Sequence, residues 1–209
     1  MNDLLDQFNM LNEYWDFSNR MEKVLHDVYK ENLEKLVLPI DIKFVAENLG
    51  FDIYRSNLSF PSQVYGWLQE KTISLSPNIT YKEQQWVVAQ GIAMHHLGLG
   101  GAINNPFFIK NNIDTVSVDI MSILLLLPIF LFQKDLSEYM ANTDHFIGSQ
   151  YLEHLCNRSQ IPMPQLCFGY YIINLMLCFQ RQIDFKNSGY DVMAFQEKDE
   201  KNEFINIYL

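Results

Sequence analysis

Basic residues are scarce in this chain and are spread singly along it. The 209 residues include 15 Lys plus Arg against 25 Asp plus Glu, a formal net charge of −10 at pH 7. Nucleic-acid binding depends on clustered Lys and Arg that neutralise phosphates, so this charge argues against direct binding to DNA or RNA. An acidic surface instead favours solubility, or a basic protein partner.

Cysteine is equally sparse. The chain has three cysteines, Cys156, Cys167 and Cys178, with no CxxC pair among them. This is neither a disulfide framework nor a zinc ribbon, and it fits a reducing cytoplasm. Cys167 and Cys178 are eleven residues apart, about three helical turns, so we expect them on one buried helix face.

The sequence also lacks a membrane span and a basic leader. Its most apolar run, residues 120–132, is shorter than the ~20 residues of a span and is interrupted by Pro128. The first residues, MNDLLDQF, are acidic and do not resemble a secretory signal. We therefore expect a soluble, cytoplasmic protein in which this apolar run, residues 120–132, forms a buried core helix.

Hydrophobic spacing predicts a mostly helical α+β domain with a small sheet packed on core helices. Three segments are expected: an amphipathic helical extension at 1–32, a main domain at 33–182, and an acidic tail or docked strand at 183–209. The extension is expected to form one or two amphipathic helices packed on the body of the protein, with Ser18 and Asn19 as the cap of the second helix if there are two. Helices are further expected at 39–49, 81–97, 115–127, 137–140, 148–157 and 165–182, and strands at 51–55, 64–69 and 72–76.

Three segments in this order carry a resemblance: PIDIKFVAENLG (39–50), VVAQGIAMHHLG (87–98) and SVDIMSILLLLP (117–128). They resemble the ImmA/IrrE family of metallopeptidases over roughly residues 33–128. The resemblance implies a zincin-like fold, in which a helix carries an HExxH zinc motif and the next helix supplies a carboxylate ligand. Two histidines four residues apart share a helix face and hold the metal, and the glutamate activates a zinc-bound water.

Carried over position by position, all four of these functional residues are replaced. Gln90 and Met94 stand at the two histidines, Gly91 at the glutamate, and Ser117 at the carboxylate. The resemblance therefore implies a vestigial site without catalytic residues, metal or cofactor. We expect Val87, Gly91 and Met94 to pack against the second helix, and Gln90 to contact Ser117.

The adjacent histidines His95 and His96 are the remaining candidates for a relocated metal site. Adjacent helical residues point about 100° apart, so the two rings cannot easily close on one ion. Asp114 and Asp119 are the carboxylates that could join them, but Asp119 lies two positions from Ser117 and is expected on the opposite side of its helix. The alternative interpretation is two surface or partly buried histidines without a ligand role.

Three functions follow from these patterns. The first is a catalytically inactive, phage- or mobile-element-borne regulator that binds another protein, such as a repressor or a toxin. The second is an acidic, anti-CRISPR-like inhibitor of a basic, nucleic-acid-binding host defence protein, and the third is a metallopeptidase with relocated ligands. Neither DNA nor a membrane is expected as partner. Exposed aromatic residues would form the protein-binding surface: Trp15, Phe168, Tyr170 and Tyr171.

Overall fold

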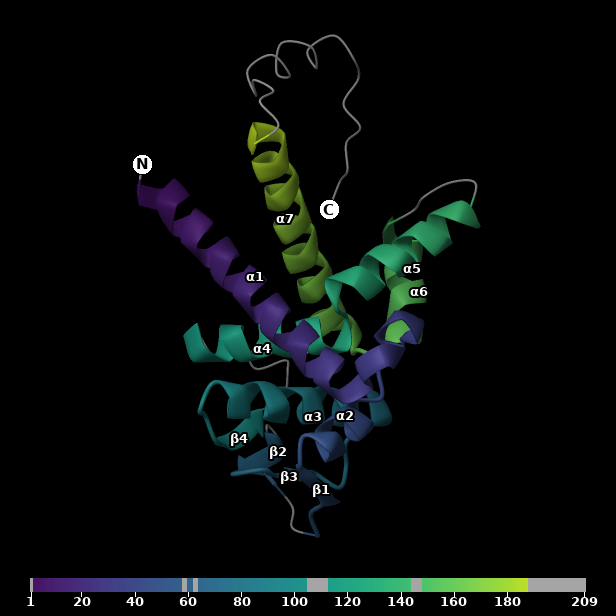
Figure 1. Ribbon diagram of the computed structural model, residues 1–209. Coiled ribbons are helices and arrows are strands. Elements are labelled where there is room, and N and C mark those ends of the chain that lie inside the picture. The colour runs from purple at the N-terminus through teal and green to yellow at the C-terminus, as the bar shows by residue number, and fades with distance from the viewer. Residues whose placement is uncertain (1, 58–59, 62–63, 105–112, 144–147, 188–209) are drawn as a thin grey trace.

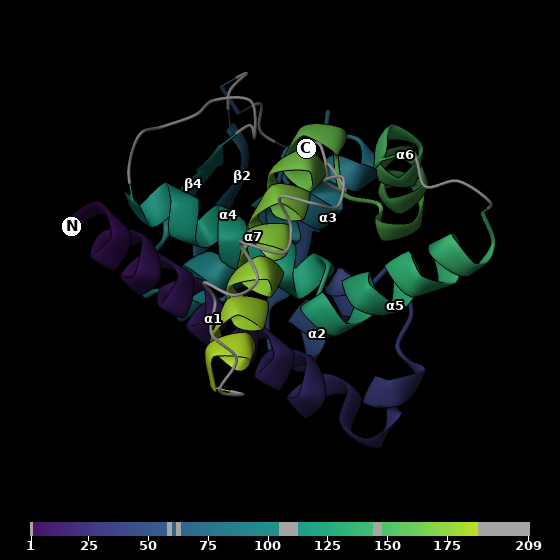
Figure 2. The same ribbon diagram turned by 90° about the horizontal axis from the view of Figure 1, so that it is seen from above.

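The computed structural model describes residues 2–57, 60–61, 64–104, 113–143 and 148–187. Within these ranges the chain is α+β and mostly helical, with one small mixed sheet. The sheet forms the base in Figure 1, helices α2 (Ile42–Asn48) and α3 (Tyr81–His96) lie on it, and α4 (Ile113–Leu126) lies above α3. Helices α1 (Asn2–Tyr29) and α7 (Met163–Asn187) cover the far side of α4 (Figures 1 and 2).

The sheet has the order β1-β3-β2-β4. Strand β1 (Asp52–Arg55) is parallel to β3 (Thr72–Leu75), while β2 (Val64–Gln69) is antiparallel to both β3 and β4 (Gly101–Asn104). Because side chains alternate along a strand, Leu68, Ile73 and Ile103 are buried on the face toward α3. Tyr54 and Trp67 lie on the other face and are exposed. The first three strands confirm the prediction, whereas β4 was not expected.

Local signals set the ends of the helices around the sheet. Thr80 and Glu83 form a reciprocal capping box at the start of α3, and Gly98, with φ +70, follows its end. Asp41 caps α2 by accepting a hydrogen bond from the Phe44 amide, so α2 begins after Asp41 rather than at Pro39. Gly50, with φ +79, lies just past its end. These predicted boundaries hold to within a few residues.

Helix α1 is a single continuous helix through Ser18 and Asn19, where the sequence left one or two helices open. Ser18 is buried and its hydroxyl donates to Glu22 one turn later, so it does not cap a second helix. A 3₁₀ segment, η1 (Lys30–Lys35), follows α1 directly. Met21 and Leu25 are fully buried and belong to the same core as α3 and α4. The first helix is therefore packed on the body of the protein, as its apolar spacing predicted.

The apolar run at 120–127 is buried, as predicted, and Pro128 separates α4 from α5 (Ile129–Ala141). Helix α5 begins right after Pro128 and not at Ser137, because its first turn, rich in apolar residues, packs into the core. Helix α6 (Gly148–Ser159) and α7 follow. Helix α7 extends to Asn187, beyond the expected boundary at 182, and the tail at 188–209 lies outside the described residues.

No single helix in the described ranges is long and apolar enough to cross a membrane. By length and composition alone, two bent pairs could do so, α4 with α5 and α6 with α7.

The three cysteines do not follow the expected pattern. Cys156 on α6 is buried, but Cys167 and Cys178 on α7 are both exposed. Their helix packs on α4 where Gly169 lies against Ile123, and Ile173 and Met176 are fully buried on the same helix, while the two cysteines lie on its outward face. The prediction of a buried cysteine face was therefore wrong, because spacing places residues on one side of a helix without saying which side is covered.

Candidate functional site

The centre of the predicted vestigial site is a polar pair between α3 and α4. Gln90 is 7% exposed in the middle of α3, and its amide nitrogen donates to Asp119 Oδ1 on α4 at 2.7 Å. The other amide atom, Gln90 Oε1, is buried and has no hydrogen-bond partner within the described part of the chain. The pair thus contains one made hydrogen bond and one acceptor without a donor.

Burial dominates the electrostatics of this pair. It raises the pKa of Asp119 from 3.8 to about 6, although the hydrogen bond from Gln90 acts in the opposite direction. A protonated carboxyl group is itself a donor, and Gln90 Oε1 is the nearby buried acceptor that lacks one. An acid and an amide can bond reciprocally in this way, so the surroundings of Asp119 favour its neutral form.

The expected contact between Gln90 and Ser117 is replaced by this contact with Asp119. Side chains two positions apart on a helix, such as those of Ser117 and Asp119, point about 200° apart. The prediction therefore had the wrong side of α4 facing α3. Ser117 is half-buried, whereas Asp119 points to Gln90. The usable signal was Asp119 itself, the one charged residue in the segment SVDIMSILLLLP.

Gly91 faces the sheet and not α4. A Cβ atom at Gly91 would lie 2.6 Å from Ile73 Cδ1 and 2.9 Å from Ile73 Cγ1 on β3, closer than real Cβ atoms come to other atoms. Val87 Cγ1 packs in the same way over Gly66 of β2. The expectation that this side of α3 packs against α4 was therefore wrong. At position 91, where the resemblance implies a glutamate, the sheet leaves no room for a side chain. Met94, three residues on, is buried at 9% exposure.

His95 and His96 end α3 without forming a metal-binding group. The His95 ring packs edge-on against Phe51 at 5.2 Å between ring centroids, and the two histidine rings are 6.4 Å apart. Burial, followed by the nearby positive charges of His95, Arg20 and Lys71, lowers the pKa of His96. Among the described residues no three His, Cys, Asp or Glu side chains gather closely enough to hold an ion, and the Asp114 side chain lies outside them.

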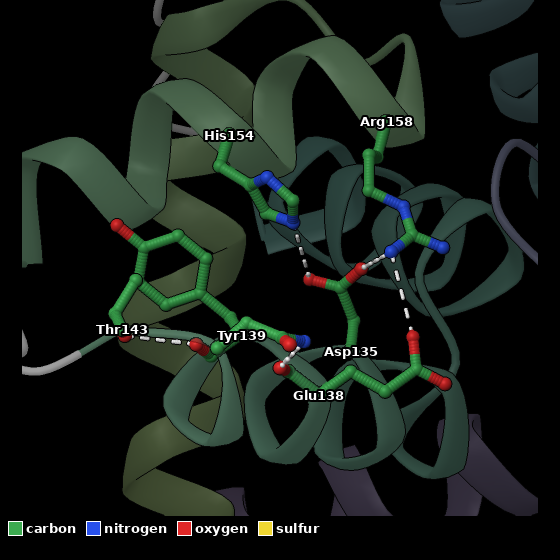
Figure 3. Close-up of polar contacts among 7 residues, drawn as sticks. Asp135, Glu138, Tyr139, Thr143, His154 and Arg158 are labelled. Atoms are coloured by element: carbon green, nitrogen blue, oxygen red, sulfur yellow. Dashed lines mark hydrogen bonds and ion pairs between the residues drawn. The ribbon is translucent and has the colours of Figure 1, made fainter.

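A second polar cluster, between α5 and α6, was not predicted (Figure 3). Asp135 on α5 is 3% exposed and pairs through Oδ1 with Arg158 Nη1 at 3.0 Å. Its other oxygen lies 3.6 Å from His154 Nε2, and Arg158 also reaches Glu138 at 3.5 Å. Burial, and then the charge of Asp135, raise the pKa of Tyr151, which is fully buried beside the cluster.

The arrangement in Figure 3 explains why this cluster is charged. Arg158 and His154 come from successive turns of α6 and lie on one face of it, toward Asp135 on α5. The Tyr139 ring, also on α5, lies 4.9 Å from the His154 ring. A buried carboxylate needs a cationic partner, so Arg158 is what permits Asp135 to remain in the core. The available sequence signal was the i, i+4 spacing of His154 and Arg158.

The predicted protein-binding residues separate into two pairs. Phe168 and Tyr171 on α7 are 36% and 43% exposed and lie one helical turn apart. Tyr170 is half-buried, with its ring against those of Phe132 and Tyr151, and Trp15 is packed against the core. Residues 163–180 of α7 contain no Asp, Glu, Lys or Arg. Phe168 and Tyr171 therefore belong to an uncharged outward helix face, here named the α7 face.

No known protein family matches this chain in a comparison with family models, and no curated protein matches it.

Proposed function

We propose that this chain is a catalytically inactive, metallopeptidase-like protein of the ImmA/IrrE type that acts inside the cell by binding another protein. The observation that carries the proposal is the hydrogen bond between Gln90 and Asp119. The resemblance places a histidine ligand at position 90 and a carboxylate ligand on the following helix. In this chain a carboxylate from α4 does face position 90, but it meets an amide there.

The residues at the remaining positions support inactivity. Hydrolysis of this type needs a basic group that activates water, and position 91 has no side chain and no space for one. Position 94 carries a methionine that is buried in the core. Under this proposal the chain keeps the packing of α3 on the sheet that an active metallopeptidase would have, but core contacts replace the hydrated metal cavity.

The binding function is assigned to the α7 face. Exposed aromatic side chains bury a large area at little entropic cost, which is why they dominate protein interfaces. The uncharged stretch 163–180 is unusual in a chain with 19% charged residues. A repressor or a toxin that offers an apolar complement is the proposed class of partner, and phages or mobile elements are the proposed source.

The second candidate function is an acidic inhibitor of a basic, nucleic-acid-binding defence protein. The net charge of −10 favours it. The two candidates differ in their dependence on salt, because screening weakens attraction between exposed charges but not the burial of apolar surface. Binding through the α7 face should survive 0.5 M salt, whereas binding through surface charge should not.

The likeness to metallopeptidases is tested by restoring the two histidines. The variant Gln90→His, Met94→His would place two imidazoles beside Asp119, and we expect it to bind one zinc ion per chain in competition with a chromophoric chelator. Adding Asp119→Asn should weaken that binding at least about tenfold, the value of one lost charged contact. The control is a histidine pair at exposed i, i+4 positions of α5, Gln133→His with Ser137→His. It measures the zinc affinity that any exposed helical histidine pair has. Equal zinc affinity in the two pairs would refute the likeness.

The binding function is tested with matched surface variants. Phe168→Ser with Tyr171→Ser should abolish capture of the partner by immobilised protein. Tyr54→Ser with Trp67→Ser, which removes aromatic side chains of similar exposure from the sheet, should leave it intact. If both variants still capture the partner, the α7 face is excluded as the binding surface.

A further inference from the structure

A cavity of about 550 Å³ lies where α1, η1 and α2 meet. Its lining includes Asp27, Tyr29 and Lys30 at the junction of α1 and η1, Asn32 of η1, and Asn48 with Leu49 at the end of α2. The volume falls within the range of sites that bind small molecules or single side chains of a partner. The cavity is separate from the α7 face and from the residues that carry the resemblance to metallopeptidases.

Several hydrogen-bond acceptors line the cavity, next to the donors of Lys30, Tyr29 and Asn32. Both α1 and α2 end here, and the last carbonyl groups of a helix carry partial negative charge. The Asp27 side chain is 63% exposed, with His26 at 3.9 Å as its ion-pair contact. Asn48 uses its amide nitrogen to bond the Phe44 carbonyl, so its amide oxygen is left as an acceptor. Among the lining residues that the structure describes, Lys30 carries the one positive side chain.

One of these helix ends already binds an ammonium group of the chain itself. Lys71 Nζ donates to the Leu49 carbonyl at 2.7 Å and lies 5.7 Å from the centre of the Phe51 ring. The carbonyl groups at the end of α2 can therefore bind a cation. Lys30 has φ +50, a backbone conformation that non-glycine residues rarely adopt. Such local strain is concentrated at functional sites.

We propose that this cavity binds an ammonium or guanidinium group, as carried by a lysine or arginine side chain of a partner or by a free polyamine. Asp27 neutralises the charge of the ligand, the Asn48 amide oxygen accepts hydrogen bonds from it, and the α1 end adds its dipole. The Leu49 carbonyl at the α2 end already accepts from Lys71. Lys30, and Lys71 at the α2 end, oppose binding through their positive charge. Neutralising Asp27 therefore weakens binding, and neutralising Lys30 strengthens it.

The test titrates the full chain with Nα-acetyl-lysine methylamide, Nα-acetyl-arginine methylamide and spermidine, and follows backbone amide signals by NMR. The norleucine analogue, which lacks the charge, is the matched control ligand. We expect shifts confined to residues 27–32 and 48–49 with the cationic probes and not with norleucine. Asp27→Asn should weaken binding about tenfold, as for a hydrogen bond to a charged group. Lys30→Met should strengthen it, and Asp16→Asn, an exposed acid elsewhere on α1, should leave it unchanged.

The outcomes separate the sources and can overturn the proposal. Spermidine binding tighter than both amino-acid probes indicates a free polyamine, and the reverse order indicates a partner side chain. Equal shifts with norleucine, shifts elsewhere, or equal weakening by Asp27→Asn and Asp16→Asn would each overturn it. Because Gln90, Met94 and Asp119 are not involved, failure of the restored zinc site leaves this result unaffected, and the two proposals fail independently.

Discussion

Asp119→Asn is expected to stabilise this protein at neutral pH, although it removes a native carboxylate from a native hydrogen bond. The substitution keeps the size and shape of the side chain and removes its charge. The asparagine oxygen can still accept from Gln90 Nε2, and the new amide nitrogen can donate to Gln90 Oε1, which is buried without a partner in the described residues. A half-made contact between α3 and α4 would become a reciprocal amide pair.

The magnitude follows from the pKa of Asp119. Burial raises this pKa from 3.8 to about 6, and one unit corresponds to about 1.4 kcal/mol. The folded state therefore binds the proton more tightly than the unfolded state does. The native protein has its full stability from this group below pH 3.8 and loses about 3 kcal/mol as the pH rises past 6. Asparagine avoids this loss, so the gain should be about 3 kcal/mol at pH 7 and close to zero at pH 3.5.

Urea unfolding followed by tryptophan fluorescence measures this difference between pH 3.5 and 7.5. Gln90→Leu is the companion variant: it removes the donor to Asp119 and should destabilise the protein at pH 7 by about 1–3 kcal/mol. A stability difference between Asp119→Asn and the native chain that does not change between pH 4 and 7 would refute the reasoning. So would an asparagine variant that is less stable at pH 7, since Asp119 would then be ionised at no cost.

Three further outcomes are expected. Gly91→Ala should lower the free energy of unfolding by about 1–3 kcal/mol, because its Cβ would overlap Ile73, and Ile73→Val should recover part of the loss in a double-mutant cycle. Arg158→Met should destabilise by about 2–3 kcal/mol by leaving the buried Asp135 uncompensated, and Asp135→Asn in the same chain should recover most of it; additive losses would contradict this coupling. A thiol reagent should modify two cysteines of the native chain rapidly and the buried Cys156 only on unfolding, as counted by mass spectrometry.

Those features of the fold that depend on neighbours along the chain were predictable from the sequence. The capping box of Thr80 and Glu83 and the glycines after α2 and α3 act within one helical turn, so their residues are sufficient to place the helix ends. Strands β1, β2 and β3 followed from short β-branched and aromatic runs between turn residues. The burial of residues 120–127 followed from their hydrophobicity alone.

Tertiary structure decided which way each helix turns and what it meets. The sequence places Gly91 and Gln90 on adjacent positions of α3, but only the sheet and α4 decide that the first faces Ile73 and the second Asp119. Cys167 is exposed for the same reason, since α4 covers the opposite side of α7. The pair of Asp135 and Arg158 joins two helices whose packing angle no local pattern encodes. Periodicity fixes the relative direction of side chains within one helix, while their partners depend on the rotation of whole helices against each other, which is set by long-range packing.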